Sequence, residues 1–315
     1  MNKLSIIEQS VRLQLRRINT AVTKERQTPS EYCLQLNLIY VRVYTSNISR
    51  RNDYENFLCT LLLPQNIKSA AFAIRAFNVE VAQVEDQVSD NKIGAMRLQF
   101  WTDALNNIYN NQPPRSPVPL ELHRILLRHK LSKHYFKRLI DARINKLSNS
   151  IFVDLESLER YCDYTASSIY FLLLEAHGTA NVNADHAASH FGKAHGLVTS
   201  IRSVPYNARK RVMILPQDVL LKNSVSSESV FQGQPSAGLK DAVFEVASCA
   251  KQHLNVVASL KKTMGKDFNT IFLPAVCIEN YLEELRKVDF DVFHSTLQRR
   301  KGFLPLQLLW RKIWS

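Results

Sequence analysis

Several basic side chains lie close together between residues 202 and 211. Arg202, Arg209, Lys210 and Arg211 are found there, at and beyond the end of an apolar helical pattern. Guanidinium and ammonium groups donate charge-assisted hydrogen bonds to phosphate oxygens, so these residues could hold a phosphate group. The alternative is a solvated basic corner at a helix end, where cations interact favourably with the helix dipole. The residue types alone favour neither interpretation.

Histidines form a second group that could do chemistry. His186 and His190 are four residues apart, which places them on one helix face, and His195 follows closely. A zinc site is conceivable, but the segment lacks the H-E-x-x-H glutamate and has no Cys nearby in sequence. We therefore expect capped or solvated histidines and no metal. Five scattered cysteines form no C-x-x-C pair and are expected to be free thiols: Cys33, Cys59, Cys162, Cys249 and Cys277.

The elements that must position these groups are helices. Gly is scarce, at 8 of 315 residues, and no alternation of short strands and helices is visible. Residues 110–119, 204–216 and 219–238 are expected to be loops or breaks. G-x-x-x-x-G-K-[ST], G-x-G-x-x-G and G-x-S-x-G motifs are absent, which argues against the common nucleotide-binding and hydrolase classes. Apolar periodicity predicts helices over 53–63, 69–88, 93–109, 120–147, 155–177, 185–202, 239–264, 272–288 and 305–314.

Four segments resemble, in order and spacing, the motifs of squalene and phytoene synthases. They are Ala-Phe-Ala-Ile-Arg-Ala-Phe at 71–77, Met-Arg-Leu-Gln-Phe-Trp at 96–101, Tyr-Cys with Thr-Ala-Ser-Ser at 161–168, and Gly-Lys-Ala, Ile-Arg and Leu-Pro within 192–216. The resemblance spans roughly residues 53–310. It implies an all-α fold, a single-domain class I isoprenoid-synthase-like bundle with a central cavity, over residues 53–315.

The resemblance also shows where this chain departs from the family. Active members hold two prenyl diphosphates through Mg²⁺ ions, and carboxylates four residues apart on two facing helices supply the oxygen ligands. The first motif falls here on Ala82, Gln83 and Asp86, and the second on Ser203 and Asn207. Because Asp86 alone keeps a carboxylate in register, metal-assisted ionisation should fail. We expect no catalytic residue, no metal and no cofactor.

Neighbouring positions do not change this expectation. Family amide side chains on the second helix fall on Gly196 and Thr199. A gapped alignment could bring Glu80 into the first motif, and Asp86 with Asp90 also forms a pair four residues apart. Neither alternative restores the second motif. The resemblance therefore implies a pseudoenzyme.

Within the family, one branch is the most similar. The runs at 76–82 and 187–194 resemble the branch of assembly factors for mitochondrial complex I, NADH:ubiquinone oxidoreductase. This implies a non-catalytic assembly factor that binds complex I subunits or assembly intermediates, at the matrix side of the inner membrane and peripherally attached to it. The alternatives are a prenyl diphosphate or anionic lipid binding protein, or a residual prenyltransferase. Residues 36–49 depart from the branch and are expected to be an insertion within a linker, 31–52.

The N-terminal segment resembles a targeting sequence, and the last helix has residues typical of a membrane interface. Residues 1–30 have a basic amphipathic character typical of a mitochondrial transit peptide, although an ordinary first helix would show the same period. The last helix carries Trp310 and Trp314 among basic residues, which suits a membrane interface. We favour docking of this helix on the core. The formal net charge of +13 suits an anionic partner, but a matrix protein that is simply basic would show the same charge. No nucleic-acid-binding motif accompanies it, so no nucleic acid is expected.

Overall fold

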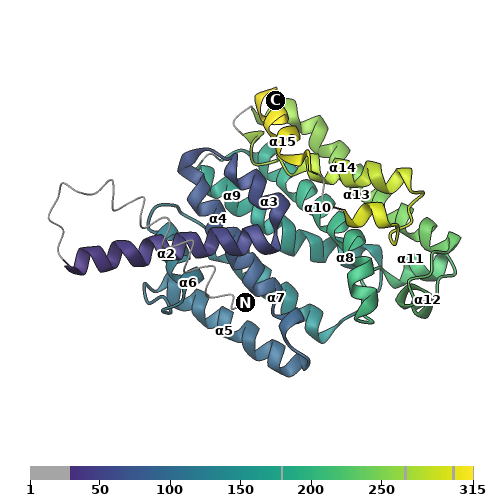
Figure 1. Ribbon diagram of the computed structural model, residues 1–315, viewed down its shortest axis with the longest axis horizontal. Helices are drawn as coiled ribbons and strands as arrows, with labels where there is room; N and C mark the ends of the chain where they lie inside the picture. Colours follow the sequence, from purple (N-terminus) through teal and green to yellow (C-terminus); the bar gives the residue numbers. More distant parts are fainter. Residues whose placement is uncertain (1–28, 179, 266–267, 300–301, 315) are drawn as a thin grey trace.

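The computed structural model describes residues 29–178, 180–265, 268–299 and 302–314, and within these ranges the regular structure is helical without strands (Figure 1). This confirms the predicted all-α class. The predicted transit peptide lies, up to residue 28, outside the described residues. In chain order the helices are α2 (Pro29–Asn52), α3 (Tyr54–Leu61), α4 (Gln65–Ala82), α5 (Asn91–Tyr109), α6 (Pro117–Leu126), α7 (Lys133–Ser148), α8 (Leu155–Cys162), α9 (Ser168–His177), α10 (Val182–Arg209), α11 (Gln217–Lys222), α12 (Ser227–Phe231), α13 (Ala237–Met264), α14 (Ala275–Lys287) and α15 (Leu304–Ile313).

Short helical turns connect some of these helices. The 3₁₀ turn η1 (Glu85–Gln87) follows α4, and η4 (Ser295–Gln298) precedes α15. A single π-helical segment, η2 (Asp163–Ser167), joins α8 directly to α9. Sequence periodicity predicted one helix over 155–177, and the chain does remain helical there apart from this local widening.

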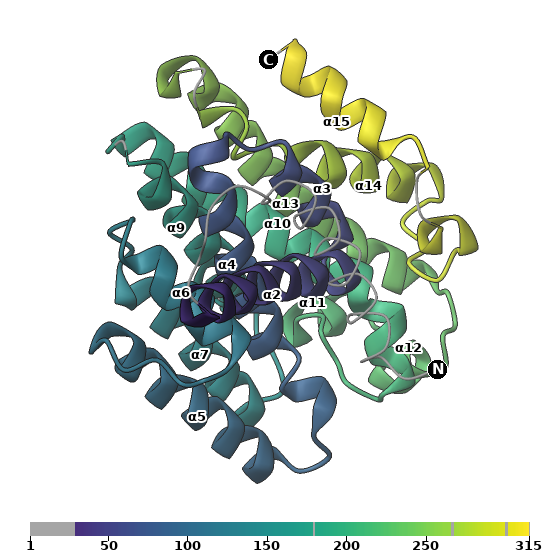
Figure 2. The same ribbon diagram turned by 60° about the vertical axis from the view of Figure 1, so that its left-hand side comes forward.

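Two helices organise the packing. Helix α10 lies against α8, η2, α9, α13 and α14, and α4 lies against α2, α6 and α9. Both views place α4 and α10 in the interior of the bundle, with α15 beside α14 at one edge (Figures 1 and 2). The single large core therefore forms between two long central helices and the shorter helices around them.

Aromatic side chains fill much of that core. Phe77 of α4 makes edge-to-face contacts with Trp101 and Phe136, with centroid distances of 5.4 and 5.2 Å. Phe191 of α10 lies edge-on to Phe272 at 5.4 Å. These offset geometries are the preferred ones for aromatic pairs and add to the gain from burying their area. The interior is thus packed with rings whose positions are fixed by several helices.

The segment 31–52 is a helix, so the expectation of a linker is wrong. Val41, Thr45 and Ser49 are buried at a spacing of four residues, which places them on one face of α2. That face packs against α4 and α6. The small Thr and Ser side chains satisfy their hydroxyls on carbonyl oxygens of the preceding turn, which makes them compatible with a buried helix face.

Helix α10 also extends beyond its predicted end. A break was expected over 204–216 because Pro205 cannot donate a backbone hydrogen bond. The helix nevertheless continues to Arg209, with Val204, Pro205 and Ala208 buried against the core. Burial of these apolar side chains outweighs the loss of one backbone hydrogen bond. Helix α11 likewise extends into the segment 219–238 and α12 lies within it, where a surface loop was expected.

The helix predicted over 120–147 is divided in two. Helices α6 and α7 are separated by residues 127–132. The Ser132 backbone N–H, just before α7, donates to a Glu175 carboxylate oxygen of α9 at 2.7 Å. A long-range contact thus fixes the start of α7, and the sequence pattern of the segment could not reveal it.

Two glycines allow α10 to approach its neighbours closely. A Cβ atom added at Gly192 would lie 2.3 Å from the Ser167 Cα, and one at Gly196 would lie 2.4 Å from the Cys162 Cβ. No real Cβ tolerates such distances, so both positions require the absence of a side chain. The π segment and the end of α8 therefore pack directly onto the α10 backbone.

Candidate functional site: a former metal site

The carboxylate of Asp86 lies against the last turns of α10. Its Oδ1 accepts hydrogen bonds from the Tyr206 hydroxyl at 3.0 Å and from the Lys210 Nζ at 2.6 Å. Asp86 sits in η1, just beyond α4, so the two segments predicted to carry metal motifs do face each other. The charge that would bind a cation is instead balanced by a lysine of the same chain.

The second motif consists of a neutral pair. The Asn207 Nδ2 donates to the Ser203 Oγ at 2.9 Å and to the Ser203 carbonyl at 3.0 Å. The Ser203 hydroxyl in turn donates to the Ser200 carbonyl at 2.8 Å. These positions therefore satisfy each other within one helix turn and present no anionic oxygen to a hard cation.

Side chains at and around the first motif also make hydrogen bonds within the protein. Gln83 donates from Nε2 to the Asn52 Oδ1 at 2.6 Å, and Ala82 is the last residue of α4. Glu80 accepts a hydrogen bond from the Tyr44 hydroxyl at 3.0 Å, and burial raises the pKa of this carboxyl. Asp90 caps α5 by accepting from the Lys92 N–H at 2.7 Å. Gln83, Glu80 and Asp90 thus each have a hydrogen-bond partner within the protein.

Between α4, α9 and α10 the interior contains a polar group among the rings. The Tyr170 hydroxyl and the His195 Nδ1 are 2.6 Å apart, and Tyr170 packs on Phe191 at 4.7 Å. Loss of water around the His195 ring, with Arg75 and Arg202 nearby, lowers its pKa to about 3. His195 was expected to be capped or solvated; the structure gives it a hydrogen-bonded place beside the core as a neutral ring.

The basic residues predicted to hold phosphate are mostly paired. Arg202 lies 2.7 Å from Glu55, and Arg211 lies 2.6 Å from Glu228. Lys210 is bound to Asp86, and Arg209 is exposed. Three of the four cations thus bond to three different carboxylates and do not converge on one point. Arg202 also lines a small cavity of about 60 Å³ with Glu55, Cys277 and Tyr281 among its walls.

A larger basic groove lies elsewhere, between α2, α4 and α6, with a volume of about 970 Å³. Arg124 forms an ion pair with the buried Glu121, and the Arg124 guanidinium also donates to the Ser69 hydroxyl. Sequence analysis did not single out this groove because its cations come from three separate helices and the turn after α6. They are Arg42, Arg50, Lys68, Arg124 and Arg128, with His129 at the margin.

Solved structures of two synthases have a fold similar to that of this chain. A dehydrosqualene synthase superposes with a TM-score of 0.76 at 18% identity, covering 87% of this chain and 95% of the other. The squalene synthase HpnC from Alicyclobacillus acidocaldarius gives a TM-score of 0.70 at 16% identity, covering 79% and 94%. The chain therefore has the all-helical fold of this class of synthases.

Sequence comparison gives the family. A profile of the squalene/phytoene synthase family matches residues 49–303. The chain belongs to the squalene/phytoene synthase family, as its motifs predicted.

A Bos taurus protein named NADH dehydrogenase (ubiquinone) complex I, assembly factor 6 is 42% identical over 272 residues, covering 85% of this chain and 82% of the relative. The Drosophila melanogaster homolog is 38% identical, covering 87% and 84%. Phytoene synthase 1 of Arabidopsis thaliana is 24% identical over 184 residues, covering 56% and 43%.

Proposed function

We propose that this chain is a non-catalytic assembly factor for mitochondrial respiratory complex I. The carrying observation is the identity of 42% over 82% of the length of a relative that bears this name. The proposed partners are complex I subunits or assembly intermediates, met at the matrix side of the inner membrane. The transit peptide proposed for residues 1–30 would deliver the chain there.

The geometry of the former metal site supports the absence of catalysis. A class I reaction needs several anionic oxygens to neutralise the metal ions beside the diphosphates. Here Ser203 and Asn207 bond to each other, and Asp86 is neutralised by Lys210. Ionisation of a prenyl diphosphate has no support from such a set of groups.

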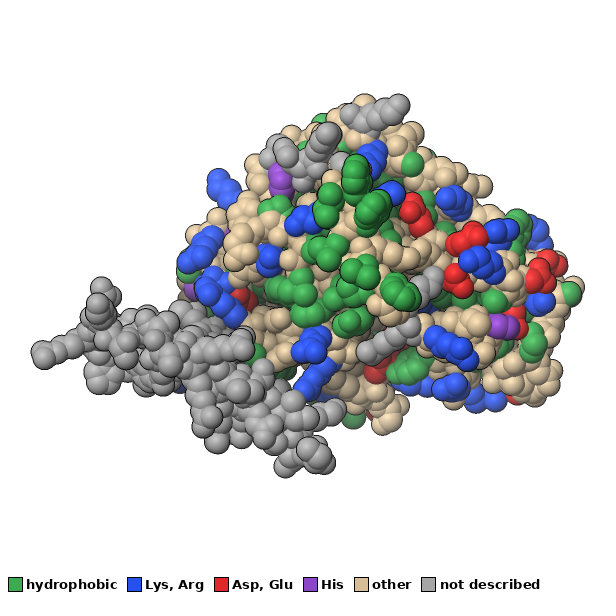
Figure 3. Space-filling view, turned by 45° about the horizontal axis from the view of Figure 1, so that its top comes forward, with side chains coloured by type: hydrophobic (Ala, Val, Ile, Leu, Met, Phe, Trp, Pro, Cys, Tyr) green, Lys and Arg blue, Asp and Glu red, His purple; other side chains and the backbone are tan. Residues whose placement is uncertain are grey.

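Peripheral membrane attachment is supported by α15. Leu304 and Leu308 are buried against α14 and α3, so the helix docks on the core as predicted. Its other side exposes Leu306, Ile313 and two tryptophans whose rings are 5.4 Å apart. Figure 3 shows hydrophobic side chains gathered on this face, with Lys and Arg side chains around them. Within the described ranges, the helices are too short or too polar to cross a bilayer. An interfacial helix of this kind would hold the protein on an anionic surface.

Removal of the protein from cells tests the proposal. Complex I should fall while the other respiratory complexes keep their abundance, and re-expression of the full chain should restore it. An equal loss of all complexes would overturn the assembly role. Crosslinking in intact mitochondria should recover complex I subunits or assembly intermediates.

The basic groove favours a second candidate function, binding of an anionic lipid or a prenyl diphosphate. Burial, and next the like charge of Arg124, lower the pKa of Arg42. An anionic headgroup would relieve this repulsion. The purified chain should be titrated with farnesyl diphosphate and with phosphatidylglycerol vesicles, with and without Mg²⁺. Binding without turnover favours this candidate, Mg²⁺-dependent turnover revives the prenyltransferase alternative, and absence of binding removes both.

A further inference from the structure

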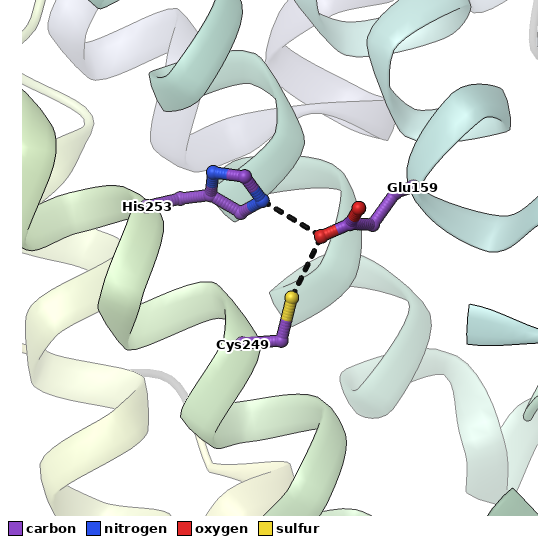
Figure 4. Close-up of side chains that lie close together, drawn as sticks. All are labelled: Glu159, Cys249 and His253. Atoms are coloured by element: carbon purple, nitrogen blue, oxygen red, sulfur yellow. Dashed lines mark hydrogen bonds and ion pairs between the residues drawn. The ribbon is translucent and has the colours of Figure 1, made fainter. Parts of the chain in front are cut away.

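A thiol, an imidazole and a carboxylate meet on the side of the bundle where α8 and α13 flank α10. Cys249 and His253 are four residues apart on α13, so they share one helix face, and Glu159 of α8 points between them (Figure 4). The Glu159 Oε1 lies 2.7 Å from the Cys249 Sγ and 2.8 Å from the His253 Nε2. The three potential ligand atoms lie within 4.8 Å of one another.

We propose that Glu159, Cys249 and His253 bind a borderline-soft divalent transition-metal ion, of which Zn²⁺ is the representative. A sulfur, a ring nitrogen and a carboxylate oxygen are the donor types that Zn²⁺ takes in proteins. Mg²⁺ and Ca²⁺ prefer sites made of oxygen alone, so the sulfur and nitrogen select against them. The proposal does not depend on the role in complex I assembly.

The geometry fits an ion after a small movement. Zinc bonds of roughly 2.0 to 2.3 Å place tetrahedral ligands about 3.3 to 3.7 Å apart. The carboxylate oxygen now lies closer than that to both partners because it accepts their protons. A side-chain shift of about 1 Å, within reach of a flexible Glu, would open the space. A movement of this size would convert the hydrogen-bonded cluster into a metal-binding one.

His190 supplies the support that a metal-binding histidine requires. Its Nδ1 lies 2.7 Å from the Nδ1 of His253, on the side of that ring opposite Glu159. When Nε2 binds an ion, Nδ1 carries the proton and needs an acceptor. His190 can accept it and donate from its own Nε2 toward His186, which lies 3.1 Å away. The chain of three rings thus orients His253 and can accept its Nδ1 proton once Nε2 binds an ion.

Charge also balances at the site. Binding of Zn²⁺ would release the thiol proton of Cys249, so the two charges of the ion meet one thiolate and one carboxylate. Lys193 of α10 lies nearby and stabilises both anions electrostatically. Partial exposure of Glu159, at 22%, leaves room for water as a fourth ligand.

Cobalt substitution in the full chain tests the site directly. After treatment with a chelator, the protein should bind one Co²⁺ with thiolate-to-cobalt charge-transfer absorption, and Zn²⁺ should displace it and raise the melting temperature. Cys249→Ala should abolish the charge-transfer band. His253→Gln should weaken binding by at least 100-fold, and His190→Gln by about 10- to 100-fold through loss of the supporting hydrogen bond. Cys277 is a buried thiol on α14 outside the cluster. The matched control Cys277→Ala should therefore keep the charge-transfer band.

The outcomes distinguish the proposal from a plain hydrogen-bond network. If the wild-type chain takes up no stoichiometric Co²⁺ or Zn²⁺, the site does not exist. An unchanged thiolate band in Cys249→Ala would equally overturn it. The titration of the wild-type chain tests metal binding by itself. Poor folding of one variant therefore does not decide the outcome.

Discussion

Asn207 donates a hydrogen bond to Ser203 across one turn of α10, with 2.9 Å between Nδ2 and Oγ. The family resemblance places a pair of metal-binding carboxylates at these two positions. The neutral pair is complete without a ligand, and Asp86 opposite is bound to Tyr206 and Lys210. The facing segments are thus joined by side-chain hydrogen bonds and one ion pair where active relatives would use metal ions.

Asp86→Ala should leave complex I assembly nearly intact. The Asp86 side chain is 47% exposed and that of its partner Lys210 is 39% exposed. Exposed ion pairs contribute about 0 to 1 kcal/mol to the free energy of unfolding. Complementation of cells that lack the protein, with complex I abundance as the readout, checks the function. Thermal unfolding checks stability, with Lys210→Ala as the matched variant. Loss of assembly by a stable, abundant Asp86→Ala protein would contradict the non-catalytic proposal.

Gly196→Ala should destabilise the fold despite the better helix propensity of Ala. Propensity favours Ala by about 1 kcal/mol. The new Cβ, however, would lie 2.4 Å from the Cys162 Cβ and 2.6 Å from its Sγ, and overpacking of this kind costs about 1 to 3 kcal/mol or more. Urea unfolding should therefore show a lower midpoint. Gly302→Ala, whose Cβ would meet nothing within 4 Å, should change stability by less than about 0.5 kcal/mol. Equal effects of the two substitutions would refute the packing argument.

Stability should fall as the pH drops below about 6.5, with His195 as a contributor. The pKa of this ring is about 3 in the folded protein and 6.5 when unfolded. Between these values the unfolded chain binds a proton that the folded chain does not, so the free energy of unfolding decreases toward acid by up to about 1.4 kcal/mol per pH unit. His195→Gln should show a shallower slope between pH 6.5 and 4.5 in urea titrations. His190, whose pKa is also lowered, keeps part of the slope in that variant. Identical slopes would show that His195 is not neutral in the fold.

Replacement of Trp310 and Trp314 by Ala should weaken membrane binding. The two rings are 67% and 72% exposed, and indole groups favour the headgroup region. Co-sedimentation with phosphatidylglycerol vesicles should fall about 10-fold or more, and binding of the wild-type chain should decline with added salt. Leu221→Ala on α11 removes an apolar side chain that is 77% exposed, away from this helix, and is the control. If the control and the double variant sediment alike, α15 is not the attachment surface.

Much of the fold could be predicted because local patterns and tertiary packing agree. The apolar period of 93–109 gave α5 nearly to the residue, and Gly178 ends α9 in the left-handed conformation that glycine favours. Two of the wrong expectations concern segments where packing overrides a local signal. Pro205 is held in α10 by its buried neighbours, and the polar face of α2 hid the small buried residues Thr45 and Ser49.

The assignment of the former metal motifs to Asp86, Ser203 and Asn207 rests on the order of family segments and stays a prediction. The present partners of these residues could not be predicted, since the bond between Lys210 and Asp86 joins residues 124 apart in the chain. Cys249 and Glu159 are 90 residues apart, so no spacing rule could bring them together. The one available signal was the spacing of four between Cys249 and His253, which places both on the same helix face.

The close packing at Gly192 and Gly196 also affects local unfolding of the protein. The α10 backbone packs directly on η2 and on the end of α8. Separation of α10 from either segment would therefore expose the backbone of both to solvent. Amide hydrogens along these three segments should consequently exchange with solvent together, in one slow cooperative event near the global unfolding free energy. The peripheral α15, attached by Leu304 and Leu308, should exchange far earlier. Local opening is thus expected at the peripheral α15, while the centre of the bundle around α10 stays closed.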